Sequence, residues 1–244
     1  MAILDFIKPD KVIMLDSSKT KGVFEFRPLE PGYGTTIGNA IRRVLLGSLE
    51  GYAICAIKIS GVDHEFATIP GVITDVTNLI LNLKQVRFIR KEGSTADGEV
   101  IKLHVFKSKA FKAGALNEAL NDFEVLNPEL VLAELDDSAD FEIEITINKG
   151  RGYVPADENR QQNDAIGTLA IDSIYTPIEK VSVNVEPTRV GQSAKYDELT
   201  MEVWTDGSID PKESFALAAK VLISHLELFA DSLIKDAKIA GDFT

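Results

Sequence analysis

The sequence predicts an α+β fold with antiparallel sheets, and three features support this fold class. Short runs that alternate apolar and polar residues, as strands do, occur near both ends and through the middle of the chain. Two other segments, residues 35–49 and the segment after Asp210, have apolar residues at the three- and four-residue spacing of helices. Turn signals separate most neighbouring strands, so these strands are expected to pair antiparallel.

The first part of the chain predicts a β-hairpin. Residues 11–15 and 21–26 are short apolar runs on either side of a polar turn at residues 17–19. Pro28 and Pro31 follow the second run. They are expected to end it, because proline cannot donate a hydrogen bond to a neighbouring strand.

A helix is expected over residues 35–49, directly after the turn at residues 32–34. Thr35 or Thr36 would cap its start, and Gly51 would end it. The stripe that this helix is predicted to bury consists of Ile37, Ala40, Ile41, Val44, Leu45 and Ser48.

The middle of the chain, from about residue 52 to residue 176, is predicted to consist mostly of strands. A hairpin turn is expected at residues 97–98 and a short helix over residues 74–83. Residues 150–164 are polar and are predicted to form an exposed loop. Apolar alternation is clearest in two runs, 53–59 and 141–147.

The last part of the chain predicts two strands and a long helix. The strands are residues 181–185 and 199–203, where apolar and polar residues alternate. Asp210 is the expected N-cap of the helix, with Pro211 as its first residue and Glu213 at the third position. A heptad-like apolar seam follows, made of Phe215, Ala219, Leu222, Leu226, Phe229 and Leu233.

The composition indicates where the protein works and which kinds of partner it can have. The net charge of −12 argues against a protein whose main task is to hold nucleic-acid phosphates, because such proteins cluster Lys and Arg. Cys55 is the single cysteine, which fits a reducing compartment. Residues 1–8 lack a signal-peptide pattern, and no apolar run approaches the roughly 20 residues of a membrane span. A cytoplasmic protein without membrane contact is expected.

Residues suited to catalysis or metal binding form no recognisable constellation in the sequence. His64, His104 and His225 lie far apart and outside zinc-binding spacings. The acidic run at residues 136–140 is interpreted as a solvated turn. We therefore expect no catalytic residue, no metal ligand and no cofactor in this chain.

One glycine pattern leaves an enzyme as the alternative hypothesis. Gly32, Gly34 and Gly38 follow a strand and open a helix, which is where phosphates bind in dinucleotide-binding folds. The spacing differs by one residue from Gly-x-Gly-x-x-Gly, and the expected acidic residue about 20 residues further on is missing. A small cytoplasmic enzyme with a phosphate or nucleotide site at residues 32–38 is the weaker hypothesis.

Both predicted helices have more apolar surface than one domain is expected to cover. Arg43 and Leu46 are three residues apart and share a face distinct from the buried stripe. Arg43 could face solvent there or could anchor a partner, as arginine often does. The C-terminal seam could pack on its own domain, yet further apolar residues lie off it, namely Leu217, Val221, Ile223 and Leu228. This surplus favours a two-fold dimer.

Six motifs follow one another over nearly the whole chain. The first, residues 29–46, reads LEPGYGTTIGNAIRRVLL. The others are 61–66, 78–84, 150–156, 175–181 with 184–186, and 206–211. Together they closely resemble, in content and order, the motifs of bacterial DNA-directed RNA polymerase alpha subunits. Residues 86–135 match that family only weakly.

The resemblance implies two subdomains and an assembly role. Residues 1–51 and 177–235 would form a dimerisation subdomain, an antiparallel sheet with two helices, and residues 52–176 an inserted, mostly-β subdomain. Residues 236–244 would be a tail or the start of a linker. The homodimer would nucleate assembly of the beta and beta-prime subunits for transcription, and the nucleotidyltransferase active site would belong to those large subunits.

The resemblance also implies roles for individual residues. Contacts with the beta subunit would come from Arg43, Leu46, Lys84, Ile171 and Ile178. The dimer interface would comprise Ile37, Ile41, Val44, Leu45, Leu222, Leu226 and Phe229. Direct DNA contact is expected from the family's separate C-terminal domain and not from these residues, in agreement with the acidic net charge.

Overall fold

The computed structural model describes residues 9, 12–106, 108–161, 165–191 and 193–236. The chain divides into two compact units. Unit 1 consists of three segments from the two ends of the chain, residues 1–49, 178–205 and 209–244. Unit 2 consists of residues 50–177 and 206–208. The fold class is α+β, since antiparallel sheets carry few helices.

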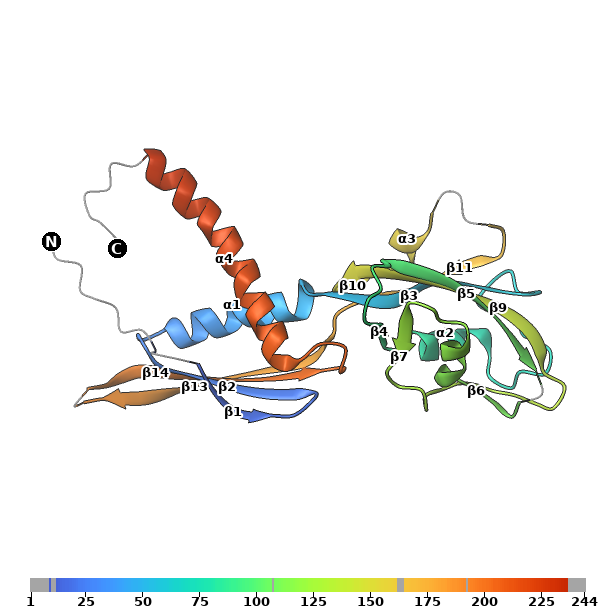
Figure 1. Ribbon diagram of the computed structural model, residues 1–244, viewed down its shortest axis with the longest axis horizontal. Coiled ribbons are helices and arrows are strands. Elements are labelled where there is room, and N and C mark those ends of the chain that lie inside the picture. The colour runs from blue at the N-terminus through green and yellow to red at the C-terminus, as the bar shows by residue number, and fades with distance from the viewer. Residues whose placement is uncertain (1–8, 10–11, 107, 162–164, 192, 237–244) are drawn as a thin grey trace. The chain divides into compact units, whose positions relative to one another are not determined.

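Unit 1 contains a four-stranded antiparallel sheet in the order β1-β2-β14-β13 (Figure 1). The predicted N-terminal hairpin is confirmed, because the first two of these strands pair with each other. Strand β2 also pairs with β14, so that Phe24 lies opposite Met201 and the two distant parts of the chain share one sheet. The strands are β1 (Ile13–Ser17), β2 (Lys21–Leu29), β13 (Ile178–Val190) and β14 (Ser193–Thr205).

Strand β2 is longer than predicted. The sequence placed its end at Pro28, but the strand continues to Leu29. The register between β2 and β14 shifts between Asp197 and Leu199, which lie opposite Leu29 and Phe26. A proline without an N–H group is tolerated at such an irregularity.

Helices α1 (Tyr33–Gly47) and α4 (Pro211–Asp236) pack on the sheet of unit 1 and contact each other. Apolar side chains on one face of the sheet pack against the two helices. The ring centroid of Phe215 in α4 lies 4.7 Å from that of Phe24 in β2. The predicted start of α4 is confirmed, because Asp210 accepts hydrogen bonds from the N–H groups of Lys212 and Glu213. The buried core comprises Phe24, Leu29, Ile41, Val44, Leu45, Leu49, Ile178, Val181, Leu199, Met201, Val203, Phe215 and Ala218.

Both predicted ends of α1 need correction. The helix starts at Tyr33, so the hydroxyl of Thr36 donates to the Gly32 carbonyl instead of capping the helix. The C-cap is Ser48, and Gly51 lies in the next strand. A Cβ at Gly51 would lie 1.9 Å from the carbonyl oxygen of Tyr175, so close packing explains this glycine.

The main sheet of unit 2 is antiparallel with the order β11-β3-β9-β5. Its core contains the inward-facing residues of β9, namely Phe141, Ile143, Ile145 and Ile147. The predicted short helix is confirmed as α2 (Val76–Leu83), which buries Val76, Leu79, Ile80 and Leu83. The strands are β3 (Glu50–Ile59), β5 (Gly98–Phe106), β9 (Asp140–Arg151) and β11 (Thr168–Ala170).

Smaller elements complete unit 2. Two predictions fail here. Gly98 opens a strand that pairs with β9, so residues 97–98 do not join a hairpin. The predicted loop over residues 150–164 is wrong for residues 150–161, which contain the end of β9, a two-residue strand and a short helix, and residues 162–164 lie outside the described residues. These elements are β4 (Phe88–Arg90), β6 (Ala110–Lys112), η1 (Ala113–Glu118), β7 (Phe123–Val125), β8 (Val131–Glu134), β10 (Tyr153–Val154), α3 (Ala156–Asn159) and β12 (Ser173–Ile174).

Candidate functional site

The N-terminus of α1 is occupied by a side chain from strand β14. The Asp197 carboxylate accepts hydrogen bonds from the backbone N–H groups of Gly32 (2.9 Å) and Gly34 (3.1 Å). These N–H groups are the ones that a phosphate would need at a helix start. The alternative hypothesis of a phosphate site at residues 32–38 is therefore not supported, because an internal anion already takes that place.

Close packing explains the two buried glycines of α1. A Cβ at Gly34 would lie 2.8 Å from Cγ1 of Val185, and one at Gly38 would lie 2.7 Å from Cγ1 of Val183. Both distances are shorter than carbon atoms tolerate, so the glycines let the helix approach β13 closely. The pattern that resembled a phosphate loop is a packing surface.

The face of α1 that was predicted to meet a second copy points into unit 1. Ile41, Val44 and Leu45 are buried in the core of that unit, and Ile37 is half-buried against it. Within one copy these three side chains are covered by their own sheet and by α4, and their assignment to the dimer interface stays a prediction. The residues assigned to a partner on the other face differ: Arg43 is exposed, and Leu46 is half-buried.

The side chains of helix α4 are buried near its start and exposed further along. Phe215 and Ala218 are buried near its start, and Leu222 is half-buried. Leu226 and Phe229 are 61% and 65% exposed. Figure 1 shows the helix crossing α1 and continuing beyond the sheet of unit 1, and the described side chains from residue 223 to residue 229 are exposed. Leu233 lies in the part of the helix whose side chains are outside the described residues.

The exposed apolar residues of α4 form one open surface. We call it the open helix face, and its residues are Ile223, Leu226 and Phe229, which follow one another at three-residue spacing. Large apolar surfaces are costly to leave in water and usually mark a contact with another macromolecule. An exposed apolar surface of this kind is typical of proteins that work as components of an assembly.

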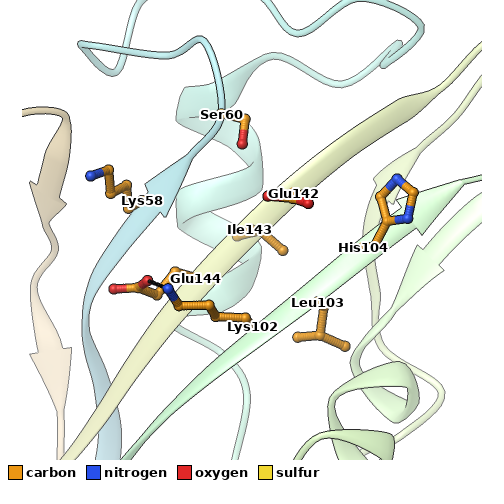
Figure 2. A pocket seen from close by; sticks show the side chains of 8 residues that line it. All are labelled: Lys58, Ser60, Lys102, Leu103, His104, Glu142, Ile143 and Glu144. Atoms are coloured by element: carbon orange, nitrogen blue, oxygen red, sulfur yellow. Dashed lines mark ion pairs between the residues drawn. The ribbon is translucent and has the colours of Figure 1, made fainter.

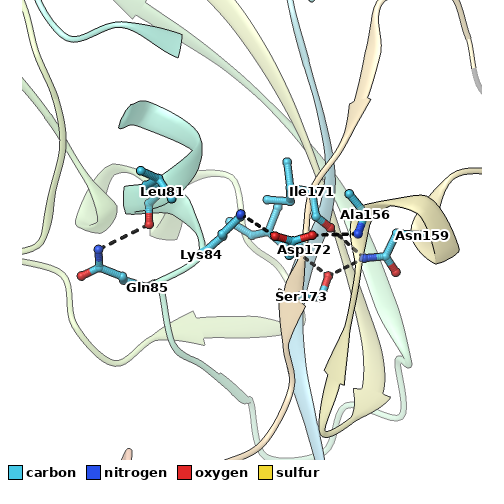
Figure 3. A network of polar contacts seen from close by, with 9 residues as sticks. Leu81, Lys84, Gln85, Ala156, Asn159, Ile171, Asp172 and Ser173 are labelled. Carbon is cyan, nitrogen blue, oxygen red and sulfur yellow. Dashed lines mark hydrogen bonds and ion pairs between the residues drawn. The ribbon is translucent and has the colours of Figure 1, made fainter. Parts of the chain in front are cut away.

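In unit 2, Lys84 lies in a network of polar contacts (Figure 3). Its ammonium group donates to Oδ2 of Asp172 at 2.8 Å, and Oδ1 of Asp172 accepts from the backbone N–H of Ala156, also at 2.8 Å. The side-chain amide of Asn159 donates to the Ile171 carbonyl (2.7 Å) and to the Ser173 hydroxyl (2.8 Å). The network thus ties α2 and the start of α3 to residues 171–173.

The ion pair perturbs the titration of Asp172. The Lys84 ammonium holds the pKa of the Asp172 carboxyl below its ordinary value, and the hydrogen bond from Ala156 adds to this effect. Both side chains are partly shielded from water, with 20% of Lys84 and 31% of Asp172 exposed. Lys84 is therefore held by its own chain and does not project freely as expected for a partner contact.

Two further predicted contact residues are buried. Ile171 and Ile178 are each 2% exposed, the first in the core of unit 2 and the second in the core of unit 1. Neither side chain reaches the surface of its own unit, and the assignment of these two residues to the beta-subunit contact stays a prediction.

A groove in unit 2 lies on the outer face of its main sheet and has a volume of about 370 Å³ (Figure 2). Lys102 and Glu144 pair across strands β5 and β9 at 2.9 Å in its lining. His104 approaches Asp140 at 2.6 Å on the same face. Opposite charges in adjacent strands are the ordinary solvent-facing side of such a sheet. Among the described residues, no group of three or more His, Cys, Asp and Glu side chains could hold a metal ion.

Asp197, Asp172 and Asn159 were missed by sequence reasoning. Asp197 is 163 residues from the N–H group of Gly34 that it caps, and Asp172 is 88 residues from Lys84. Local patterns cannot reveal such pairs. The one available signal was the absence of a usable capping side chain directly before α1, which calls for an acceptor from elsewhere.

Comparison with known proteins assigns the family. Residues 57–176 match the RNA polymerase Rpb3/RpoA insert domain. The DNA-directed RNA polymerase subunit alpha of Flavobacterium psychrophilum is 55% identical over 96% of this chain and 71% of the relative. That of Bacteroides thetaiotaomicron is 56% identical over the same shares, and that of Symbiobacterium thermophilum is 47% identical over 93% and 70%. The chain belongs to the family of DNA-directed RNA polymerase alpha subunits.

No described helix is both long enough and apolar enough to cross a membrane.

Proposed function

We propose that this chain is a non-catalytic scaffold subunit of a DNA-directed RNA polymerase. It dimerises and then assembles the beta and beta-prime subunits, which carry the nucleotidyltransferase chemistry. The chain works in the cytoplasm, uses no cofactor of its own and makes no direct DNA contact through these residues. Family membership and the open helix face of α4 support this proposal.

The observation that carries the dimer is the exposure of Leu226 and Phe229 on a helix whose first half is buried. A second copy can cover this surface with the same surface of its own, which is the commonest form of homodimer. The dimerisation role then belongs to unit 1, and α4 supplies the exposed apolar part of the interface, next to α1, which it contacts.

The surface left for the large subunits is the outer face of α1. Arg43 is exposed there beside the half-buried Leu46. An arginine next to apolar surface is a typical anchor of protein interfaces, because it combines a charge with a long apolar stem. We assign this face to the beta subunit.

Reconstitution tests the proposed function. The purified chain is mixed with purified beta subunit and then with beta-prime, and each mixture is measured by size-exclusion chromatography with light scattering. The expected series is a dimer, a complex of the dimer with beta, and a complex with both large subunits. A chain that remains monomeric and elutes apart from both would contradict the proposal. Saturable nucleotide binding abolished by Gly34→Val would favour the enzyme instead.

A further inference from the structure

Three side chains lie in one row across the sheet of unit 1. Trp204 in β14 lies directly opposite Lys21 in β2 on one side and directly opposite Lys180 in β13 on the other. Residues that lie opposite each other in adjacent strands point to the same face of the sheet. The three side chains therefore form a continuous strip, which we call the Lys-Trp-Lys row.

The indole ring of the row holds both lysine side chains. The Nζ atom of Lys180 is 4.6 Å from the centre of the Trp204 ring, and that of Lys21 is 5.2 Å from it. An ammonium group is attracted to an aromatic ring at such distances, because the ring face carries partial negative charge. Two positive charges are thus held close together, no further apart than the sum of the two distances.

The Lys-Trp-Lys row lies on the face of the sheet that the helices leave open. Its neighbours along the strands point to the helix side: Val203 is in the core, and a Cβ at Gly22 would lie 2.8 Å from Cβ of Pro211, the first residue of α4. Successive side chains of a strand alternate between its two faces. Figure 1 shows α1 and α4 together on one side of this sheet. Lys180 is exposed, and the other two side chains of the row are half-buried.

The two positive charges of the row have no carboxylate partner. Among the ion pairs of the described residues neither Lys21 nor Lys180 takes part, whereas Arg27 in the same sheet pairs with Glu25 and Glu198. The chain as a whole has a net charge of −12, so this pair of lysines is a local exception. A surface of this charge is complementary to the carboxylates of a partner.

Acidic side chains limit the size of the ligand that fits the row. Glu179 is exposed next to Lys180, and Glu202 lies two residues before Trp204 on the same face. A run of nucleic-acid phosphates would meet these carboxylates as well as the lysines, and such binding needs several cations along the backbone. A short peptide segment with two carboxylates and an apolar side chain between them meets only the two ammonium groups and the ring.

We propose that the Lys-Trp-Lys row binds an acidic segment of a partner protein. One carboxylate of the segment pairs with each lysine, and an apolar side chain between them packs against the Trp204 ring. This contact goes beyond the proposed dimer and the proposed beta-subunit contact, because it lies on the face of the sheet opposite to α1 and α4.

Intrinsic fluorescence of the full chain tests this proposal, since Trp204 is its only tryptophan. The probe is a synthetic peptide of the sequence Glu-Ser-Leu-Ser-Glu, whose first, third and fifth side chains point the same way when it is extended. We expect a saturable change in the emission of Trp204 in the millimolar range of peptide. The peptide Gln-Ser-Leu-Ser-Gln should cause no such change. An absent response to the acidic peptide, or an equal response to both peptides, would overturn the proposal.

Substitution of the lysines shows whether their charges hold the peptide. Lys21→Met and Lys180→Met keep an unbranched apolar chain and remove the charge, and each should weaken binding on the order of threefold and the double variant on the order of tenfold. Lys19→Met is the matched control, because Lys19 is exposed between β1 and β2 and lies outside the row. Circular dichroism checks that each variant is folded. A loss in Lys19→Met as large as in Lys180→Met would show that only net charge matters, and the row would then not be a site.

A nucleic acid is the other ligand class that two lysines and a tryptophan can attract. Oligothymidylate is therefore titrated under the same conditions and should bind more weakly than the acidic peptide. Tighter binding of the oligonucleotide, falling steeply as salt is added, would refute a protein ligand. The titrations need neither the dimer nor the large subunits, so their outcome is independent of the proposed function.

Discussion

The Asp197 carboxylate caps helix α1 from a strand that lies 163 residues further along the chain, with its Oδ2 atom 3.1 Å from the backbone nitrogen of Gly34. Helix starts are usually capped by the residue directly before them. Here that residue is Gly32, whose φ of 85° no other residue type adopts easily and which has no side chain to offer. The start of α1 therefore depends on β14 being in place.

Removing this cap should destabilise unit 1. Asp197→Ala leaves the N–H groups of Gly32 and Gly34 without their acceptor, and we expect the free energy of unfolding to fall by about 1 kcal/mol. Urea denaturation followed by circular dichroism measures the change. Lys195→Ala, at an exposed position of the same strand, is the control and should have little effect. Equal stability of Asp197→Ala and wild type would refute the role of the cap.

Gly38 should tolerate no side chain. In Gly38→Ala the new Cβ would lie 2.7 Å from Cγ1 of Val183 and 3.0 Å from Cδ1 of Leu199, so the helix has to move off the sheet. We expect a loss of about 1–3 kcal/mol in the free energy of unfolding, as for other overpacked sites. Gly47→Ala is the matched control in the same helix, where a Cβ meets nothing within 4 Å and alanine should stabilise by up to about 1 kcal/mol. The same urea titration compares the two, and a Gly38→Ala chain as stable as Gly47→Ala would contradict this packing.

A charge on the open helix face should separate the dimer. Leu226→Glu places a carboxylate where two copies are expected to bury apolar surface, so light scattering should report a monomer at concentrations at which the wild type is a dimer. Lys220→Glu introduces the same charge at another exposed position of α4 and should leave the dimer intact. A dimer that persists in Leu226→Glu would show that the interface lies elsewhere.

Arg43 and Arg42 are adjacent, both exposed, and differ in the expected contact. Arg43→Ala should leave the dimer intact and weaken beta-subunit binding, by about 2–5 kcal/mol if the charge is buried and paired in the complex. Arg42→Ala is the control, which should bind as the wild type does. Pull-down of the beta subunit over a concentration series gives both affinities. An equal loss of beta-subunit affinity in the two variants would mean that the helix contributes only its positive charge and no specific contact of Arg43.

Unit 2 should lose stability in acid through Asp172 and Glu50. Lys84 lowers the pKa of Asp172, and Lys149 followed by Arg151 lowers that of Glu50. A carboxyl whose pKa is lower in the folded chain stabilises the fold above its unfolded pKa, which is about 4 for both residue types. That contribution is lost as the pH falls further, through the folded pKa.

Melting temperatures between about pH 6 and about pH 3 can test this sign. Asp172→Asn should melt lower than the wild type at neutral pH, and its decline on acidification should be shallower, because one of the two titrating groups is gone. Parallel curves would contradict the assignment. Asp63→Asn, at an exposed position of unit 2, serves as the control and should follow the wild type.

Periodicity predicted the regular elements well. The stripe of α2 and the alternation of β13 and β14 were confirmed, since a buried face imposes its spacing on the residues that form it. The errors lie where a distant contact decides the local structure. Gly51 was interpreted as a helix end, but it is small because Tyr175 packs on it. Residues 150–161 were interpreted as part of a polar loop, although the backbone N–H of Ala156 and the side chain of Asn159 donate hydrogen bonds to Asp172 and Ile171.

The candidate site was harder to predict than the fold. Ile41 and Leu226 both belong to apolar stripes of helices, and only the three-dimensional packing shows that the first is buried and the second exposed. Sequence spacing reports that a face is apolar and does not report what covers it. The resemblance likewise names Ile171 and Ile178 as contact residues, and only the structure shows that both side chains are buried within their own units.

The pairing of β2 with β14 also sets the order in which the protein can fold during its synthesis. Nearly all of unit 2 has been synthesised once residue 177 is added, whereas the sheet of unit 1 waits for residues 193–205, and α4 comes later still. The N-terminal hairpin and α1 therefore remain without their sheet partners until those later strands have been made. A chain that stalls before α4 lacks the open helix face and cannot use it to bind a second copy.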